Sequence, residues 1–245
     1  LEEIPYGRSS IDTTVATSRR LLPLASGVRM LLDVLHRSRL QFPGMAIGFL
    51  RRILDEATTH VRRRIVGGKP LEAYDQVQDR IAEIQAAYTA CSAMCAYSSR
   101  EAPIDRDCSS LALPANAIKT VVTDMMHTAA QSLLQLVGAK GYRRDHYAGR
   151  AIVDCRPFQI FEGSNDILYE QIAATVLKGM YRAGHTSLAL YLKTVDVTSR
   201  AVGLVQHLFD FHPGDHLPQR KMVDLGRAIG RVVCMQMVTD IGDNG

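Results

Sequence analysis

Apolar residues that recur every three or four positions over long stretches most constrain what this 245-residue chain can fold into. Such spacing is typical of helices that bury one face, and Leu31, Leu32 and Leu35 show it near the start. It predicts four helical regions, at about 24–65, 71–98, 114–137 and 164–182. Pro43 should cause a bend, or end a separate short helix before the main one. Long helices with short connections predict a mainly α fold, an antiparallel four-helix bundle.

The two ends of the chain follow other patterns. Ile11 to Thr17 is rich in β-branched residues, which predicts a short strand-like segment. Beyond Gly184, which should end the fourth helix, helical patches at 187–211 and 219–239 predict an extra C-terminal helical pair packing on the bundle or on another subunit. The loop between these patches has possible metal ligands, but its prolines and glycine favour an ordinary loop: Asp210, His212, Asp215 and His216.

Composition narrows the classes of function. Hydrophobic residues make up 47% of the chain, enough for a sizeable core. The net charge of +4 is spread along the chain and does not indicate a nucleic-acid partner. Cys91 and Cys95 have no histidine nearby to complete a metal site, so we expect five reduced thiols and no metal. No apolar run approaches the ~20 residues of a membrane span, and no signal peptide is visible, which makes the cytoplasm the simplest location.

One carboxylate stands out by its surroundings. Glu162 lies between an apolar run that ends at Phe161 and the segment Gly163-Ser-Asn-Asp166. Gly163 permits a turn, and the polar residues after it can cap a following helix. A carboxylate against an apolar wall can serve as a general base. The alternative is a surface glutamate at the start of a helix.

Four segments in this order resemble the acyl-CoA dehydrogenase family. Gln135 to Tyr142 is similar to its Gln-x-x-Gly-Gly-x-Gly-aromatic segment, and Phe161-Glu-Gly-Ser164 to its aromatic-Glu-Gly-Thr segment. Arg39, with Gly48 nine residues later, resembles the start of the first long helix of the family's C-terminal domain. Arg64 to Gln78 looks like its Arg-x-x-Phe-Gly-x-Pro-Leu loop and the next helix, and Lys119 stands where the family often has a lysine. The resemblance spans residues 20 to 180.

The resemblance implies a chemistry and a set of roles. Glu162 would take the α-proton of an acyl-CoA thioester while a hydride leaves the β-carbon for FAD. The backbone N–H of Glu162 would help to polarise the thioester carbonyl, and the substrate-binding residues would be Arg39 and Gly163. The residues implied to contact FAD are Arg64, Gln135, Gly138, Ala139, Ser164 and Asp166. Departures from the family's pattern mark a divergent branch, and they fall at Gly67, Asp75, Ala139, Val153, Asp166 and Tyr169.

The resemblance also implies a division of the chain. Residues 1–20 would be the remnant of a middle β-domain, 21–184 the C-terminal helical-bundle domain, and 185–245 a helical extension. The family's other domains would be supplied by the rest of the protein or by a partner chain, in a homo-oligomer (a dimer or tetramer) or a heteromer. An electron-transfer flavoprotein or a similar acceptor would take the electrons. The alternatives are a non-catalytic subunit of the same fold, a related flavoenzyme with another oxidation, and a helical binding module.

Overall fold

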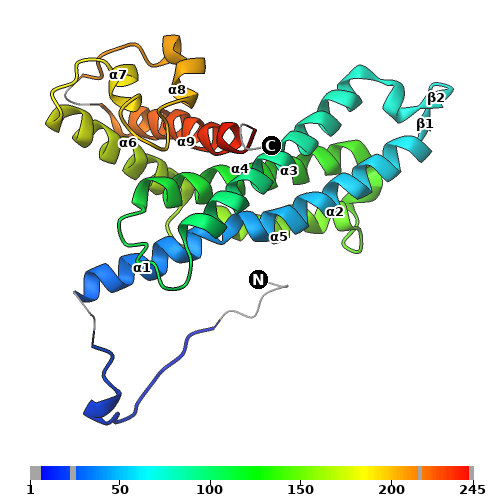
Figure 1. Cartoon of the computed structure of the whole chain (residues 1–245). Helices are drawn as coiled ribbons and strands as arrows, with labels where there is room; N and C mark the ends of the chain where they lie inside the picture. Colours follow the sequence, from blue (N-terminus) through cyan, green and yellow to red (C-terminus); the bar gives the residue numbers. More distant parts are fainter. Residues whose placement is uncertain (1–6, 23–25, 215–216, 243–245) are drawn as a thin grey trace.

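A computed structural model describes residues 7–22, 26–214 and 217–242, and they are mostly helical (Figure 1). The α-helices are α1 (Gly27–Leu40), α2 (Phe42–Arg63), α3 (Asp75–Glu101), α4 (Ala112–Val137), α5 (Tyr147–Cys155), α6 (Asn165–Arg182), α7 (Leu188–Leu192), α8 (Ala201–Leu204) and α9 (Gln219–Gly242). Turns of 3-10 helix are η1 (Thr17–Arg19), η2 (Leu71–Ala73), η3 (Gly138–Tyr142), η4 (Arg156–Gln159) and η5 (Gln206–Leu208). The predicted mainly α bundle is confirmed.

Helix α4 is the centre of the bundle. It packs against α1, α2, α3, α5, α6 and α9. Every residue from Pro114 to Thr123 is buried, so this part of the helix meets protein on all sides. Each polar side chain on such a helix must find a partner inside the protein.

The break between the first two helices lies where proline predicted it. α1 ends at Leu40, Gln41 separates the helices, and α2 begins with Phe42 and Pro43. A proline in a first turn costs no hydrogen bond, because that N–H has no partner within the helix. The second of the two expected arrangements, a separate short helix before the main one, is therefore correct.

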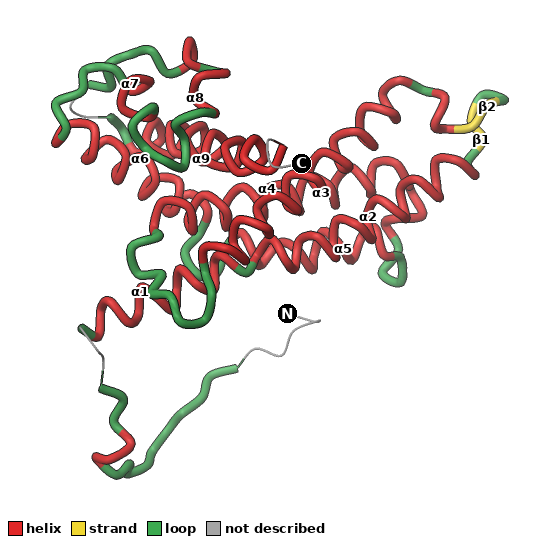
Figure 2. The backbone as a smooth tube through the Cα atoms, viewed as in Figure 1, coloured by secondary structure: helices red, strands yellow, loops and turns green. Residues whose placement is uncertain are grey.

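The N-terminal strand prediction is wrong for the residues that the structure describes. Residues 7–16 form no regular element, η1 follows, and Ile11 is 85% exposed. A strand needs a neighbouring strand to pair with. Within the described ranges, strands occur only in a hairpin, β1 (Ile65–Val66) with β2 (Lys69–Pro70), which lies at the far end of α2 (Figure 2).

Two helical predictions also need correction. The sequence predicts no helix between 137 and 164, yet α5 begins at Tyr147, where the His146 side chain accepts a hydrogen bond from Ala148 N. The patch at 187–211 is not one helix but α7, α8 and η5. Between them the Thr198 hydroxyl donates to Leu192 O at 2.6 Å, a local bond that competes with helix continuation. The tail therefore contributes one long helix, α9, and short turns, rather than a pair.

The tail's suspected metal ligands have other roles where they are described. Asp210 accepts a hydrogen bond from Ser187, and the His212 ring contacts Thr186 O. Asp215 and His216 lie outside the described residues. The described ranges contain no group of three or more side chains suited to a metal ion. None of the helices they form is both long and apolar enough to cross a membrane.

Candidate active site at the Glu162 turn

The Glu162 turn, residues 160–164, joins η4 to α6 in a left-handed backbone conformation. Glu162 has a φ of 56° and Gly163 a φ of 92°. The prediction that Gly163 permits a turn is confirmed, but Glu162 takes a positive φ as well. A residue with a side chain is uncommon there, and such strain costs on the order of 1–3 kcal/mol and persists only where the surroundings enforce it.

Two neighbours on α1 hold Glu162. The Ser38 hydroxyl donates to Glu162 Oε1 at 2.7 Å, and Arg39 Nη2 donates to the Glu162 carbonyl at 2.8 Å. Arg39 Nη1 donates to Asn116 Oδ1 at 2.7 Å, and the side chain is buried. Burial lowers the pKa of Arg39, and the charge of Glu162 partly restores it. Arg39 therefore lies inside the protein, as a part of the site's framework.

Lys119 holds the other side of the turn from α4. Its Nζ donates to the Gly163 carbonyl at 2.9 Å and to Asn165 Oδ1 at 2.8 Å, and the residue is fully buried. Burial, followed by the charge of Arg39, lowers the pKa of Lys119 to about 8. Two cations from two helices thus fix consecutive carbonyls of the turn, those of Glu162 and Gly163.

The Glu162 carboxylate has one bonded and one free oxygen. Oε1 accepts from Ser38, whereas Oε2 is buried and has no hydrogen-bond partner among the described residues. The rings of Phe42, Phe158 and Phe161 form a cluster beside the turn, with centroids 5.4–6.3 Å apart. Arg39 Nε is a second buried atom without a partner in the described part of the chain. Ser98 Oγ on α3 is the third such atom in these ranges. Buried polar atoms rarely stay unpaired, so Glu162 Oε2 and Arg39 Nε are candidates for bonding to a ligand.

The residues next to Glu162 behave partly as predicted. Ser164 occupies the N-cap position of α6, but its side chain forms no capping bond. Asp166 lies in the first turn of α6, where a negative charge is favourable, and faces Arg227 at 3.9 Å. Ser164 and Asp166 therefore belong to the Glu162 turn and the helix it begins.

The remaining predicted cofactor residues lie at the other end of α4. Gln135, Gly138 and Ala139 line a hollow of about 420 Å³, which we call the Gln135 hollow and which is completed by Gln131, Leu134 and Tyr142. Gly138 has a φ of 68°, and a side chain there would meet nothing within 4 Å. At 1.5 Å of helix per residue, this end lies roughly 24 Å from Lys119. The structure groups these three residues and separates them from Glu162.

Arg64 belongs to this second end. It is exposed, follows the last residue of α2, and forms no ion pair with a described residue. Burial lowers the pKa of nearby His60, followed by the charges of Arg64, Lys140 and His146. Positive groups from the end of α2 and from η3 thus gather around one histidine, next to the Gln135 hollow.

Comparison with known proteins assigns the fold to a family. Residues 25–177 match the family model described as acyl-CoA dehydrogenase, C-terminal domain. The chain belongs to the acyl-CoA dehydrogenase family. The human mitochondrial very long-chain specific acyl-CoA dehydrogenase is 23% identical over 145 residues, which are 59% of this chain and 22% of that protein. The rat mitochondrial long-chain specific enzyme is 27% identical over 169 residues, 68% of this chain and 38% of that protein.

Solved structures of acyl-CoA dehydrogenases share the fold. One from Bacillus anthracis, complexed with FAD, has a TM-score of 0.64 at 16% sequence identity. The match covers 85% of this chain and 42% of the Bacillus chain. One from Slackia heliotrinireducens has a TM-score of 0.57 at 20% identity, covering 69% and 44%. The chain thus spans less than half the length of each of these relatives. The match to the Bacillus protein covers a larger share of this chain than residues 1–177 make up. The similarity in fold therefore continues into the tail.

The sequence patterns did not single out several residues around the Glu162 turn. Ser38 and Asp124 bind the Glu162 turn or its flanks, Asn116 accepts a hydrogen bond from Arg39, and Asn165 and Tyr169 bind to α4. A signal for them exists, because α4 carries a polar stripe at helical spacing in otherwise apolar sequence: Asn116, Lys119, Thr120, Thr123 and Asp124. Polar residues on one face of a buried helix indicate a polar partner, here the turn.

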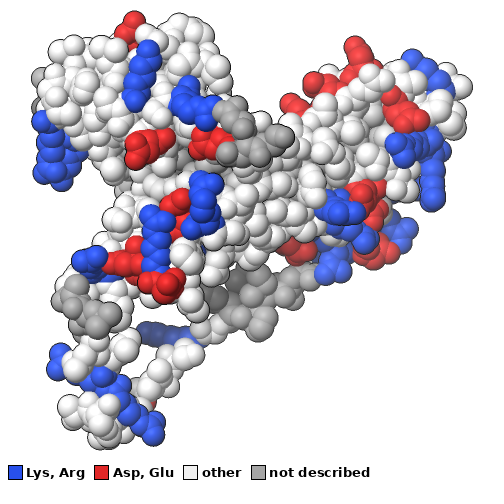
Figure 3. Space-filling model, in the orientation of Figure 1, with Lys and Arg blue, Asp and Glu red and all other residues white. Residues whose placement is uncertain are grey.

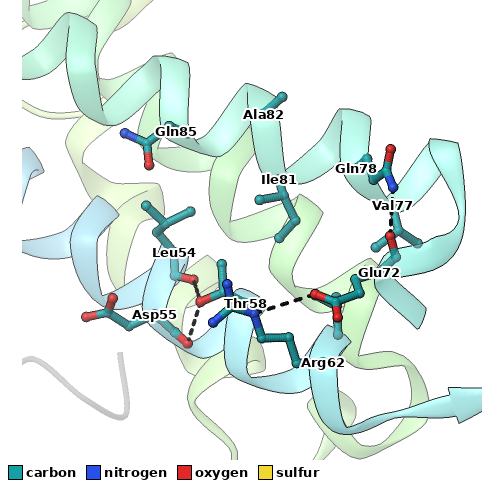
Figure 4. A pocket seen from close by; sticks show the side chains of 11 residues that line it. Leu54, Asp55, Thr58, Arg62, Glu72, Val77, Gln78, Ile81, Ala82 and Gln85 are labelled. Atoms are coloured by element: carbon teal, nitrogen blue, oxygen red, sulfur yellow. Dashed lines mark hydrogen bonds and ion pairs between the residues drawn. The ribbon is translucent and has the colours of Figure 1, made fainter. Parts of the chain in front are cut away.

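Two hollows also open on the surface, one away from the Glu162 turn and one that reaches Asp124 and Tyr169. A hollow of about 680 Å³ between α2 and α3 is spanned by the ion pair of Arg62 with Glu72 (Figure 4). A second, more apolar groove of about 680 Å³ runs between α3, α4 and α9. On the face drawn in Figure 3, lysines and arginines lie among aspartates and glutamates instead of forming a patch of one sign.

Proposed function

We propose that this chain is the C-terminal helical part of an FAD-dependent acyl-CoA dehydrogenase in which Glu162 removes the α-proton of an acyl-CoA thioester. The observation that carries the proposal is the unpaired, buried Glu162 Oε2, on a carboxylate whose other oxygen is fixed by Ser38. A general base needs a free lone pair at a fixed position, and this carboxylate offers one.

Arg39 supports a substrate at the same place. Its Nη atoms are bonded to Glu162 O and Asn116, while Nε is buried without a partner among the described residues. A free donor on Arg39, which also holds the Glu162 carbonyl, and a free acceptor on Glu162 suit an acyl thioester. Its carbonyl oxygen takes a hydrogen bond while the adjacent carbon loses a proton. The backbone N–H groups of Glu162 and Gly163 are further donors of the same turn.

The residues at the other end fit a flavin dinucleotide. FAD, when bound, supplies the acceptor for the hydride. The Gln135 hollow offers amide groups, and Gly138 offers a backbone that a ligand can approach closely. Arg64 and Lys140 provide the positive charge that a pyrophosphate requires. Ser164 and Asp166 lie beside Glu162, far from the Gln135 hollow. They would contact FAD at the Glu162 end.

The proposal includes further protein surface. Val28, Leu31 and Val34 on α1 are 58–69% exposed, an apolar face that suits the remaining domains of a dehydrogenase or a partner chain. In an oligomer, the Glu162 end of α4 in one copy and the Gln135 end in another copy would contribute to the same cofactor site. An electron-transfer flavoprotein or a similar acceptor would reoxidise the enzyme.

The decisive experiment replaces Glu162 in the complete natural protein. Glu162→Gln keeps size and hydrogen bonding but removes the basic oxygen, so we expect turnover of saturated acyl-CoAs to fall by roughly 10³-fold or more, with flavin content unchanged. Glu170→Gln, an exchange of the same kind on α6, is the control and should keep its activity. A Glu162→Gln protein with normal turnover refutes the proposal. Wild-type protein with neither flavin nor turnover supports the non-catalytic subunit instead.

A further inference from the structure

Helix α9 lies beyond the residues that match the family, yet it packs closely against the helix that follows the Glu162 turn. α9 covers α6 and also contacts α4 and α3 (Figure 1). The two backbones come close at Gly226, where an added Cβ atom would overlap Tyr169 O and the carbonyl carbon. Glycine at this position therefore lets the backbone of α9 touch the backbone of α6.

Tyr169 connects this contact to α4. Its ring lies beneath the guanidinium of Arg227, with Cζ 5.1 Å from the centroid, and its hydroxyl donates to Asp124 Oδ2 at 2.7 Å. The side chain is buried, and this burial, followed by the charge of Asp124, raises the pKa of Tyr169 far above its ordinary value. The hydroxyl thus remains a donor at every relevant pH.

Asp124 forms hydrogen bonds to both flanks of the Glu162 turn. Its Oδ1 accepts from Gln159 Nε2, before the turn, and from Asn165 Nδ2, after it, each at 2.7 Å. Asn165 Oδ1 in turn accepts from Lys119, which also holds the Gly163 carbonyl. One carboxylate thereby clamps the two residues three positions on either side of Glu162.

We infer that α9 is a positioning element for the candidate base: through Gly226, Tyr169 and Asp124 it holds the Glu162 turn in its left-handed conformation. The positive φ of Glu162 requires enforcement from several sides. Asp124 on α4 holds both flanks of the turn, and α9 supports Asp124 through Tyr169 on α6. The consequence for catalysis rests on the proposed function, whereas the restraint on the turn does not. Tyr169, one of the departures from the family's pattern, is the residue that makes this connection.

The test compares substitutions in the complete protein with matched controls. Gly226→Ala forces α9 away from α6, whereas Gly242→Ala, in the same helix, meets nothing within 4 Å. Tyr169→Phe removes only the bond to Asp124 and keeps the ring. Leu192→Ala, at a fully buried position in α7, controls for destabilisation of the tail away from this contact. All four are measured well below their thermal midpoints.

Two readouts separate positioning from general stability. We expect Gly226→Ala and Tyr169→Phe to lower kcat roughly tenfold to a hundredfold with KM for acyl-CoA little changed, because a misplaced base affects the chemical step. Amides of residues 159–168 should exchange hydrogen for deuterium faster in these two variants than in Gly242→Ala or Leu192→Ala. Flavin content should be equal in all.

The outcomes distinguish the two proposals. The inference is overturned if hydrogen exchange at residues 159–168 is unchanged in both Gly226→Ala and Tyr169→Phe. It is also overturned if Leu192→Ala loses as much kcat as these two variants for the same loss of thermal stability. A Glu162→Gln protein that stays active overturns the proposed function alone, and the exchange measurement then still decides whether α9 restrains the turn.

Discussion

The two ends of α4 differ in how much of their site this chain builds. Around Glu162, side chains from α1, α4 and α6 are buried and bonded to one another. Around the Gln135 hollow, the predicted residues are exposed, and Arg64 forms no ion pair with a described residue. The chain therefore fixes the Glu162 carboxylate by itself, whereas the predicted residues of the second end lie on an exposed surface.

Energetics explains why the two ends should respond differently to substitution. A buried polar atom that loses its partner keeps its full desolvation cost, so the network at Glu162 is sensitive to each of its members. An exposed cation is solvated with or without a neighbour, so its removal changes stability little. The comparison predicts coupled loss of stability and activity at one end and loss of binding alone at the other.

Replacing Arg39 should have the largest effect. Arg39→Met leaves Glu162 O and Asn116 Oδ1 without their donor, so we expect the free energy of unfolding to fall by about 3 kcal/mol and turnover to be lost. Urea denaturation measures the first and an acyl-CoA assay the second. Arg29→Met, in the same helix, removes an exposed ion pair with Asp107 and should cost under about 1 kcal/mol. Equal losses in the two variants would contradict the comparison.

Lys119 should give the Glu162 end a particular pH dependence. Its pKa falls from 10.5 to about 8 on folding, so between these values the unfolded chain holds a proton that the folded chain lacks. Stability from this group must therefore rise with pH through that window, by at most about 1.4 kcal/mol per pH unit, and stay constant below pH 8. Urea denaturation of wild type and Lys119→Met at pH 7, 8.5 and 10 measures it. As the pH rises from 8.5 to 10, the free energy of unfolding of wild type should increase relative to that of Lys119→Met. Parallel plots of this free energy against pH would refute the lowered pKa of Lys119.

Sequence patterns predicted the parts of this molecule that depend on local chemistry. Helical periodicity gave the long helices, Pro43 gave the start of α2, and Gly163 gave the turn. The sequence patterns failed where the structure of a segment depends on residues distant in sequence. Ile11 to Thr17 has strand propensity but no strand to pair with among the described residues, and α5 was hidden by the glycines around it.

The site shows the same limit. Glu162 could be singled out because its neighbours in sequence form an apolar wall and a turn. Nothing near it in sequence indicates that Asp124 binds both flanks of that turn, or that Gly226 brings α9 against Tyr169. These contacts join residues tens of positions apart, and only the packing of α4, α6 and α9 brings them together. The separation of Arg64 and Gln135 from Glu162 likewise follows from the length of α4.

Replacing Arg64 should have the smallest effect on the folded chain and thereby sharpen the contrast between the two ends. We expect Arg64→Gln to change the free energy of unfolding of the flavin-free protein by less than about 0.5 kcal/mol, because the side chain is exposed and has no ion-pair partner in the described ranges. If its charge serves a pyrophosphate, the Kd for FAD should rise roughly tenfold, which titration of flavin fluorescence would show. Arg63→Gln, on the neighbouring exposed residue of α2, should leave that Kd unchanged. A Kd that moves equally in both variants would show that only the general positive charge of this end matters, and would remove Arg64 from its specific role.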